Sequence, residues 1–352
     1  MGKTLKVAVI GCGFISGMHL EGYSKLADVK IVALCDIIEE RANERKAKYG
    51  DAETKVFTDY KKMLKEVKPD IVSVCTENCM HAEITIEALN AGIHVLCEKP
   101  MAITGKEADA MVAAAKKNNV KLSVGYQLRF QNEAMLLHKE IESEKLGKIY
   151  YAEASSLRRR GVPTWGVFLD KDKQGGGPLI DIGTHIVDRT LWLMNDYSPV
   201  VSAVGNCYDN LIPLGGFNNG GHWDIEKFNV EDSAFGTVTL ASGATLVVKA
   251  SWAANIKEMD TNVSLLLGVK AGAELKNDVL TLNYESNNHL WHCESEPFRD
   301  NESAYNREIA AWVKAVREDS EPIVRCEQAA QVVKVLEAIY MSARNGGKAV
   351  TF

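Results

Sequence analysis

A continuous apolar segment, Leu5 to Ile10, runs directly into a turn that carries two glycines, Gly11 and Gly13. Gly11 permits a tight turn after a strand, and Gly13 lets the main chain approach a pyrophosphate group. The third position holds Ser16, which is small enough for a helix to pack closely on the strand, and that helix offers its first amide groups to an anion. A plain turn can carry the same glycines, but the strand before them and the helix after them favour a dinucleotide site. The feature predicts that the chain begins with a Rossmann-type unit.

The rest of the first 125 residues alternates between strand and helix patterns. Further strands are expected at 31–35, 71–75, 93–97 and 121–124, and helices at 39–49, 82–91 and 106–118. Gly92 directly follows the helix expected at 82–91 and is a typical C-terminal stop. Strands that alternate with helices form a parallel sheet covered on both faces, so residues 1–125 are predicted to be the Rossmann domain.

The remaining residues, 126–352, read differently. Strand patterns at 149–157, 200–208, 233–240, 245–252 and 263–267 follow one another without a helix between most of them, and Ser242-Gly243 joins two as a hairpin. This order predicts a second domain with a largely antiparallel sheet. Two helices, 302–318 and 327–344, close the chain and can pack back on the first domain. The glycine-rich stretch 214–221 reads as a surface loop, a composition shared by loops that cover substrates.

The composition limits the classes of molecule that the protein is expected to bind. The 352 residues carry a formal net charge of −6 at pH 7, which argues against nonspecific binding to nucleic acid or to an anionic membrane. No apolar segment approaches membrane-spanning length, and the first residues lead into a strand without a secretory signal. The eight cysteines are scattered and show no zinc-ligand spacing, which favours buried thiols, no metal and a cytoplasmic location.

Asp36 follows the second expected strand, 20 residues after Ser16, where an acid binds the adenosine ribose hydroxyls of a dinucleotide. Ile37 and Ile38 come next, so neither Arg nor Ser is available for a 2′-phosphate. A carboxylate there repels that phosphate, and the sequence therefore favours NAD over NADP. The alternative interpretation is an ordinary aspartate at the start of a helix.

Lys99 follows Glu98 at the end of the strand 93–97. In a doubly wound sheet a lysine at this edge lies where a nicotinamide ring binds, and burial can tune it to exchange a proton with a substrate hydroxyl. The alternative is a solvated loop lysine.

The segment Asp181-Ile-Gly-Thr-His185-Ile-Val-Asp188 places two carboxylates around a histidine. If a helix begins near Gly183, Asp181 flanks its start and His185 and Asp188 lie on neighbouring faces. A carboxylate beside a histidine fixes its tautomer and raises its basicity, which suits a proton acceptor. The alternative is that Asp181 caps the helix and His185 packs in a core.

Substrate contacts are expected after the last Rossmann strand and in the second domain. Tyr126, Gln127 and Arg129 are expected to face the cleft. Arg158 begins a run of three arginines that leads to Trp165, a combination that can bind hydroxyls and stack on a sugar ring. The arginines equally fit a solvated strand edge, whereas Trp165, between Pro163 and Gly166, fits a shaped loop.

Four motifs in order carry a resemblance to a known family: Gly11-x-Gly13, Thr76-Glu-Asn78-Cys-Met-His81, Glu98-Lys99-Pro100, and Asp181-x-Gly-Thr-His185-x-x-Asp188. Together they resemble the Gfo/Idh/MocA oxidoreductases, relatives of glucose–fructose oxidoreductase and inositol dehydrogenase. The chain departs from the family's common Thr-Pro-Asn by placing Glu77 at the middle position. The loop therefore lacks a rigidifying proline and gains a carboxylate near the expected cofactor.

The resemblance implies a Rossmann domain, a C-terminal α/β domain with a large open sheet, and hydride chemistry on sugars or polyols with NAD. It implies that Lys99 is catalytic with His185 and Asp181, and that the open sheet is covered by a partner in a homodimer or homotetramer. The cofactor contacts it implies, together with those of the glycine turn, are Gly11, Gly13, Phe14, Ile15, Asp36, Thr76, Asn78, His81, Glu98 and Lys99. The substrate contacts expected from both lines of argument are Tyr126, Arg129, Arg158, Trp165, Asp181 and His185.

The predicted reaction is oxidation of a secondary alcohol of a sugar, sugar derivative or polyol, with His185 or Lys99 as the terminal base. An alternative is a glycosidase that keeps NAD bound and uses it in a redox-neutral cycle of oxidation, elimination, hydration and reduction. A non-catalytic NAD or sugar sensor is a third reading, one that has no use for Lys99 together with His185.

Overall fold

The computed structural model describes residues 4–296 and 302–352, which form two compact units. Unit 1 comprises the described residues of Met1–Gln127 and Asn301–Ala330, and unit 2 those of Leu128–Asp300 and Gln331–Phe352. The chain thus forms most of unit 1 and then most of unit 2. It returns to unit 1 for residues up to Ala330 and ends in unit 2.

Unit 1 is built on a six-stranded parallel sheet in the order β3-β2-β1-β4-β5-β6. The central strands are mostly apolar, interrupted by Lys6 in β1 and Ser73 in β4, as is typical of strands covered on both faces. The order reverses between β1 and β4, which is the position where α/β sheets open a crevice for ligands. The strands are β1 (Leu5–Ile10), β2 (Val29–Cys35), β3 (Lys55–Phe57), β4 (Ile71–Val74), β5 (His94–Cys97) and β6 (Leu122–Val124).

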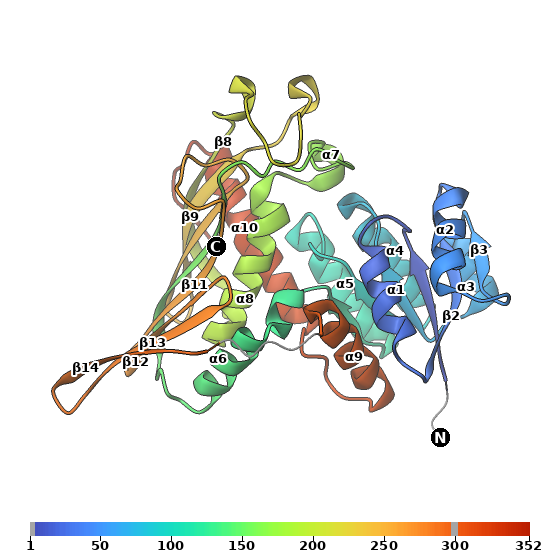
Figure 1. Cartoon of the computed structure of the whole chain (residues 1–352), viewed down its shortest axis with the longest axis horizontal. Coiled ribbons are helices and arrows are strands. Elements are labelled where there is room, and N and C mark those ends of the chain that lie inside the picture. Colours follow the sequence, from blue (N-terminus) through green and yellow to red (C-terminus); the bar gives the residue numbers. More distant parts are fainter. Residues whose placement is uncertain (1–3, 297–301) are drawn as a thin grey trace. The chain divides into compact units, whose positions relative to one another are not determined.

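Helices follow the strands of unit 1 (Figure 1). Side chains fix several of their starts: Asp59 accepts hydrogen bonds from the first amides of α3, and Thr104 and Glu107 form a capping box on α5. The helices are α1 (Ser16–Ser24), α2 (Glu39–Tyr49), α3 (Tyr60–Val67), α4 (His81–Asn90), α5 (Gly105–Asn118) and, from the returning segment, α9 (Ala304–Arg317), with the 3₁₀ turns η1 (Asn78–Met80) and η2 (Gln127–Phe130).

The returning helix α9 completes the apolar core of unit 1. Ile309 and Trp312 belong to the same buried cluster as Leu20 and Tyr23 of α1. Gly22 of α1 faces Ile309 so closely that a Cβ on the glycine would lie 2.8 Å from the isoleucine side chain. The two helices are therefore in direct contact, although their sequences lie far apart.

Unit 2 holds a nine-stranded sheet in the order β14-β13-β12-β11-β7-β10-β9-β8-β15. All its pairs are antiparallel except β7 with β10. The strands are β7 (Ile149–Arg158), β8 (Val200–Tyr208), β9 (Ser233–Leu240), β10 (Thr245–Ser251), β11 (Asp260–Gly268), β12 (Ala271–Lys276), β13 (Val279–Ser286), β14 (His289–Glu294) and β15 (Val350–Thr351).

Helices cover one face of this sheet (Figure 1). Ile339 of α10 lies against Gly205 and Gly236, where a Cβ on either glycine would come within 3 Å of it. Within unit 2 the described part of the chain places no helix on the opposite face. The helical segments are α6 (Asn132–Glu142), α7 (Lys171–Gln174), the π-helix η3 (Leu179–Gly183), α8 (Thr184–Met194), the 3₁₀ turns η4 (Ile212–Leu214) and η5 (Ile225–Lys227), and α10 (Cys326–Arg344), which begins in unit 1.

The predicted fold class, a Rossmann domain and an α/β domain with a large, mostly antiparallel sheet, is confirmed. The hairpin at Ser242-Gly243 joins β9 and β10 as expected. The sequence did not predict strand β3, helices α3 and α6, or the three strands from β12 to β14. Among the described residues no helix combines the length and apolarity that crossing a membrane requires.

Candidate functional site

The carboxyl edge of the unit 1 sheet gathers most of the predicted cofactor residues. Because β2, β1, β4 and β5 are adjacent, the segments that leave them meet at one edge. These segments contain the glycine turn after β1, Asp36 after β2, Thr76 after β4, and Glu98 with Lys99 after β5.

The two glycines of the turn have different roles. Gly11 has φ +87°, and a Cβ there would lie 2.4 Å from the carbonyl oxygen of Cys75, so only glycine fits. A Cβ at Gly13 would meet nothing within 4 Å. Ser16 Oγ donates to the Gly13 carbonyl at 2.6 Å, and Arg45 of α2 donates to the same oxygen at 2.7 Å. The turn is therefore held firmly while open space remains in front of Gly13, which fits a pyrophosphate group at the start of α1.

Asp36 is tied into this turn. Its side chain is buried, and its two oxygens accept hydrogen bonds from the backbone amides of Cys12 at 2.7 Å and Ile38 at 2.8 Å. Helix α2 has Ile38 as its N-cap and no side-chain cap, so Asp36 does not cap that helix. The aspartate holds the two loops that follow β1 and β2 together.

The apolar residues of the turn separate into two kinds. Phe14 is 76% exposed beside the open space at Gly13, whereas Ile15 packs against the core of unit 1. Phe14 is therefore the more exposed of the two, while Ile15 is partly buried.

His81 joins two loops at this edge. Its ring nitrogens lie 2.7 Å from the Pro100 carbonyl oxygen and 3.1 Å from the Thr76 carbonyl oxygen, and the side chain is fully buried. Burial lowers the pKa of His81, against the opposing effect of these two carbonyls. Asn78 is also buried on this loop, and Thr76 is half-buried. The Lys99–Pro100 peptide bond is cis.

Glu98 is buried, and both its oxygens have partners inside unit 1. Oε1 lies 2.8 Å from Nε2 of His19, and Oε2 accepts the backbone amide of Lys99 at 3.0 Å. His19 in turn contacts Ser73 Oγ at 3.1 Å, and Ser73 contacts the Tyr23 hydroxyl at 2.8 Å. The sequence analysis missed His19 because its partner lies 79 residues away; a histidine on a helix that begins at a glycine turn was the available signal.

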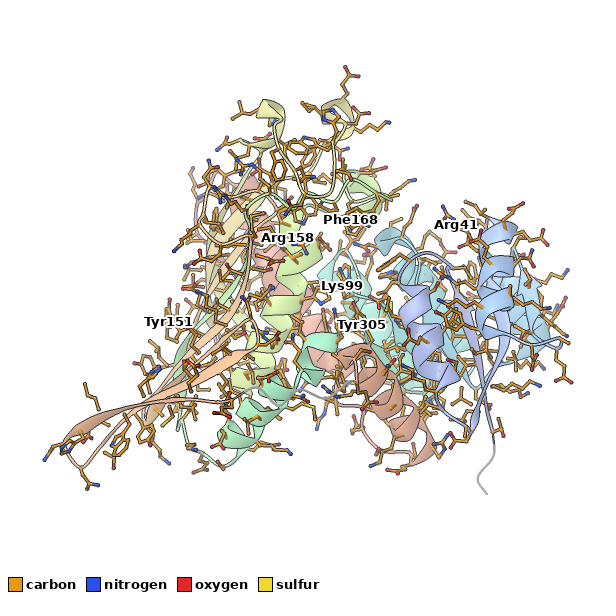
Figure 2. All side chains as sticks on the ribbon, in the orientation of Figure 1. Arg41, Lys99, Tyr151, Arg158, Phe168 and Tyr305 are labelled. Atoms are coloured by element: carbon orange, nitrogen blue, oxygen red, sulfur yellow. The ribbon has the colours of Figure 1, made fainter. Side chains whose placement is uncertain are left out.

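Lys99 itself is half-buried at the edge, in the position labelled in Figure 2. Tyr126, which follows β6, is fully buried and does not face a cleft as expected. Its neighbour Gln127 donates to the hydroxyl of Tyr305, a residue of α9 that is also labelled in Figure 2, at 3.1 Å.

In unit 2, Asp181 lies in the π-helix η3, directly before α8. Its buried carboxylate accepts a hydrogen bond from Trp252 Nε1 at 3.0 Å, a contact that the sequence did not reveal. His185 follows four residues later in the first turn of α8 and is half-buried, so the two side chains lie on one side of a continuous helical run. Short π-helical segments are frequent at functional sites.

Two glycines that precede η3, Gly176 and Gly177, pack closely against other segments of unit 2. A Cβ at Gly176 would lie 2.2 Å from the hydroxyl of Tyr340, and one at Gly177 would lie 2.0 Å from the carbonyl oxygen of Glu231. Tyr340 donates to the Glu231 carboxylate at 2.7 Å, and Leu179 N donates to the same oxygen at 3.3 Å. These two glycines, which the sequence analysis overlooked, fix the entry to the segment that carries Asp181.

Arg129 and Asp188 require a correction. Both are fully buried, and the guanidinium binds the two carboxylate oxygens at 2.8 and 2.6 Å. Arg129 therefore does not face a cleft. Asp188 pairs with Arg129, whereas the sequence had suggested that it lies beside His185. A cation and a carboxylate that lie 59 residues apart in the sequence neutralise each other inside unit 2, which their local sequence cannot indicate.

Arg158 is the last residue of β7, and Trp165 lies on the segment that follows it. Arg158 is half-buried, donates to the Gly161 carbonyl and faces Asp260 at 3.7 Å. Trp165 is 57% exposed and meets Phe168 edge to face, and Phe168 meets Trp252 in the same way. An aromatic series thus leads from the tryptophan that binds Asp181 to an exposed ring.

The glycine-rich stretch 214–221 is docked on this segment. Asn218 exchanges hydrogen bonds with both backbone groups of Val162, at 2.9 and 3.0 Å, and the Gly220 carbonyl accepts from Thr164. The loop therefore forms part of the Trp165 region.

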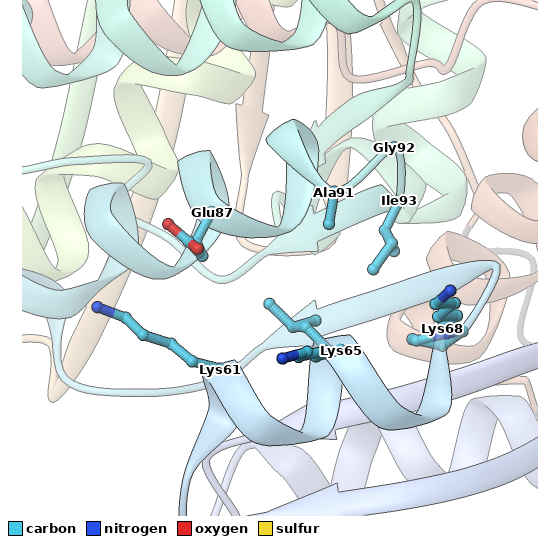
Figure 3. A pocket seen from close by; sticks show the side chains of 9 residues that line it. Lys61, Lys65, Lys68, Glu87, Ala91, Gly92 and Ile93 are labelled. Carbon is cyan, nitrogen blue, oxygen red and sulfur yellow. The ribbon is translucent and has the colours of Figure 1, made fainter.

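A depression elsewhere on unit 1 is lined by Lys61, Lys65 and Lys68 of the α3 region and by Glu87 and Gly92 (Figure 3). It lies where β4 and β5 begin, at the amino edge of the sheet, and contains none of the residues described above. It has no part in the site at the carboxyl edge.

Comparisons with known proteins assign this arrangement to a family. The family model described as "Oxidoreductase family, NAD-binding Rossmann fold" matches residues 5–126, and "Oxidoreductase family, C-terminal alpha/beta domain" matches residues 138–352. D-glucoside 3-dehydrogenase of Escherichia coli is 36% identical over 344 residues, which cover 97% of this chain and 96% of that protein. Levoglucosan dehydrogenase of Pseudarthrobacter phenanthrenivorans is 29% identical, with 71% and 68% covered.

Solved structures share the fold over the whole chain. An oxidoreductase domain protein from Kribbella flavida has a TM-score of 0.86 at 25% identity, with 99% of each chain covered. Levoglucosan dehydrogenase in complex with NADH has a TM-score of 0.84 at 22% identity, with 99% of this chain and 98% of that chain covered. The two family models together span nearly the whole chain, and it therefore belongs to the Gfo/Idh/MocA oxidoreductase family, with a first unit that is an NAD-binding Rossmann domain.

Proposed function

We propose that this protein oxidises a secondary alcohol of a sugar, sugar derivative or polyol with NAD, and that a glycoside of glucose is the first substrate to test. The observation that carries the proposal is Lys99, presented half-buried at the carboxyl edge of the sheet and fixed through its own amide to a buried carboxylate. The choice of glycoside rests on the 36% identical D-glucoside 3-dehydrogenase, with which the chain aligns over nearly its full length. The relatives named above are dehydrogenases, so the redox-neutral glycosidase is not favoured.

The chain's own residues would hold the cofactor as follows. The turn at Gly11 and Gly13 and the first amides of α1 bind the pyrophosphate, and Asp36 binds the adenosine ribose. Phe14 contacts the dinucleotide from its exposed position, and Thr76, Asn78 and His81 shape the loop beside it. NAD, when bound, supplies the hydride acceptor.

Proton transfer belongs to Lys99, His185 and Asp181 in this proposal. Lys99 or His185 accepts the proton of the substrate hydroxyl, and Lys99 stabilises the negative charge that develops on that oxygen. Asp181, whose carboxylate is oriented by Trp252, fixes the tautomer of His185 and makes it a stronger proton acceptor. Trp165 and Arg158 bind the sugar, Trp165 through its exposed ring.

The test is NADH formation over a panel of glucosides, free sugars and polyols. We expect Lys99→Ala and His185→Ala each to lower kcat by about a hundredfold or more, the usual contribution of a positioned acid or base, with NAD affinity largely retained. Lys106→Ala and His289→Ala, which alter exposed residues outside the site, serve as matched controls. Near-normal turnover in either site variant would refute its assigned role, and no NADH with any substrate would refute the proposed reaction.

We further propose that two copies of the protein associate through the uncovered face of the unit 2 sheet. The register of β10, β7 and β11 places Val247 and Leu265 on that face, one on each side of Glu153. Tyr151 and Phe235 lie on the same face, where Figure 2 shows Tyr151 on the side away from α8. A sheet face with this apolar content is stabilised when a second copy removes it from water.

A cytoplasmic location is proposed from the thiols. All eight cysteines are free, and burial raises the pKa of Cys12, Cys35 and Cys97 to about 12. Such thiols are suited to a reducing compartment, where no disulfide is needed. Cell fractionation tests this assignment.

A further inference from the structure

His19 and Glu98 form a buried polar pair in unit 1 that the proposed reaction does not use. His19 lies on α1 with 1% of its surface exposed, and Glu98 follows β5 with 5% exposed. Their contact of 2.8 Å joins Nε2 of the imidazole to Oε1 of the carboxylate. A buried pair of this kind costs desolvation and adds little net stability compared with apolar side chains. Its place beside Lys99 calls for another explanation.

The pair constrains the main chain of Lys99. The second oxygen of Glu98 accepts the Lys99 amide at 3.0 Å, so the carboxylate is a bridge between the imidazole of α1 and the peptide that precedes the lysine side chain. Gly125 closes the space behind the carboxylate, since a Cβ there would lie 2.9 Å from Oε1. The carboxylate therefore has one position, and the backbone amide of Lys99 is held with it.

We propose that His19 is a positioning residue for the reaction, acting through Glu98 to hold Lys99 in the orientation that proton transfer needs. The inference rests on the proposed function of Lys99. A displacement of about 1 Å at a reacting group costs up to a hundredfold in rate, so an anchor for the lysine peptide has a measurable effect.

The charge of Glu98 depends on the same contact. Burial raises the pKa of the Glu98 carboxyl, but the hydrogen bond and charge of His19, followed by Lys99, outweigh it and leave the pKa lowered. Without His19, burial prevails and the carboxyl takes up a proton at higher pH, which weakens its hold on the Lys99 amide. The other titratable groups that face Glu98 are Cys75, His81, Cys97 and Tyr305.

Two substitutions of nearly equal size separate the contacts of His19. In His19→Gln the side-chain amide reaches the place of Nε2 and keeps a donor for Glu98. In His19→Asn the amide reaches only the place of Nδ1 and keeps the contact with Ser73. We expect His19→Asn to lower kcat by about tenfold to a hundredfold at saturating NAD and to move the acidic limb of its pH profile to higher pH. His19→Gln is expected to retain most of the wild-type kcat and to shift the pH profile less than His19→Asn does, because it keeps the hydrogen bond to Glu98 but carries no charge.

Tyr23→Phe is the matched control at the far end of the same polar chain. It removes the hydroxyl that contacts Ser73 and is expected to lower the thermal midpoint without changing kcat or the pH profile. Equal losses of kcat in the Gln and Asn variants, or a wild-type profile in His19→Asn, would overturn the proposal.

A second readout needs no substrate. Hydrogen exchange of the peptide that contains the Lys99 amide is expected to be faster in His19→Asn than in His19→Gln, in the protein without added NAD. Equal exchange in the two variants contradicts positioning by His19. If the wild type forms no NADH on any substrate, the proposed function fails while the exchange measurement still decides whether His19 anchors Lys99.

Discussion

Asp36 shows how one carboxylate can serve structure and selectivity together. Its oxygens accept the amides of Cys12 and Ile38, which joins the loops after β1 and β2. The negative charge thus stands at a fixed point at the carboxyl edge, where, in the proposed function, it favours ribose hydroxyls and repels a 2′-phosphate. Ile37, 88% exposed, adds no cation that would offset the repulsion.

We expect Asp36→Ser to weaken NAD binding by about tenfold, equivalent to 1.4 kcal/mol, and to raise the ratio of kcat/KM for NADP over NAD. Asp36→Asn is the comparison, because it removes the charge while one side-chain oxygen remains to accept an amide. If both variants keep the wild-type cofactor ratio, Asp36 does not set the selectivity.

At the same scale, the residues that sequence reasoning placed well are those whose role is local. Gly11, Gly13 and Asp36 follow strand ends, so the strand pattern positions them directly. Arg129 and His19 were missed or misplaced because their partners, Asp188 and Glu98, are remote in sequence. Such pairs depend on how elements pack, which periodicity does not report.

The element that links β1 to α1 contains a matched pair for experiment. We expect Gly11→Ala to destabilise unit 1 by about 2 kcal/mol or more, because φ +87° strains an L-residue and the methyl group meets the Cys75 carbonyl. Gly13→Ala is expected to leave the thermal midpoint unchanged and to weaken NAD binding, because its methyl group enters the space reserved for the pyrophosphate.

Circular dichroism melts and NAD titrations check the two variants together. The reverse pattern, with a stable Gly11→Ala and an unstable Gly13→Ala, would show that the turn has another conformation.

Elements with a strong apolar period were predictable, and those without it were not. Strand β1, five of whose six residues are apolar, has the bounds that the sequence predicts. Strands β13 and β14 were not predicted because β13 has one buried residue and β14 has none, so pairing by main-chain hydrogen bonds, and not burial, defines them. Strand β3 is three residues long, too short for a period to show.

For the whole molecule, the proposed association of two copies has a direct test. We expect Leu265→Glu to produce monomers in sedimentation experiments at micromolar concentration, because the charge falls amid Val247 and Glu153 on the uncovered sheet face. Leu136→Glu, on the exposed surface of α6, is the control and is expected to leave the oligomer intact. A wild-type protein that sediments as a monomer contradicts the proposal.

The contact between α1 and α9 also bears on how the chain is made. During synthesis the six strands of unit 1 leave the ribosome well before Ile309 and Trp312, which complete the core around Leu20 and Tyr23. The apolar surface of the nascent Rossmann sheet that α9 later covers therefore stays exposed until most of unit 2 has been translated. Such long-range closure slows folding and leaves an early intermediate prone to aggregation.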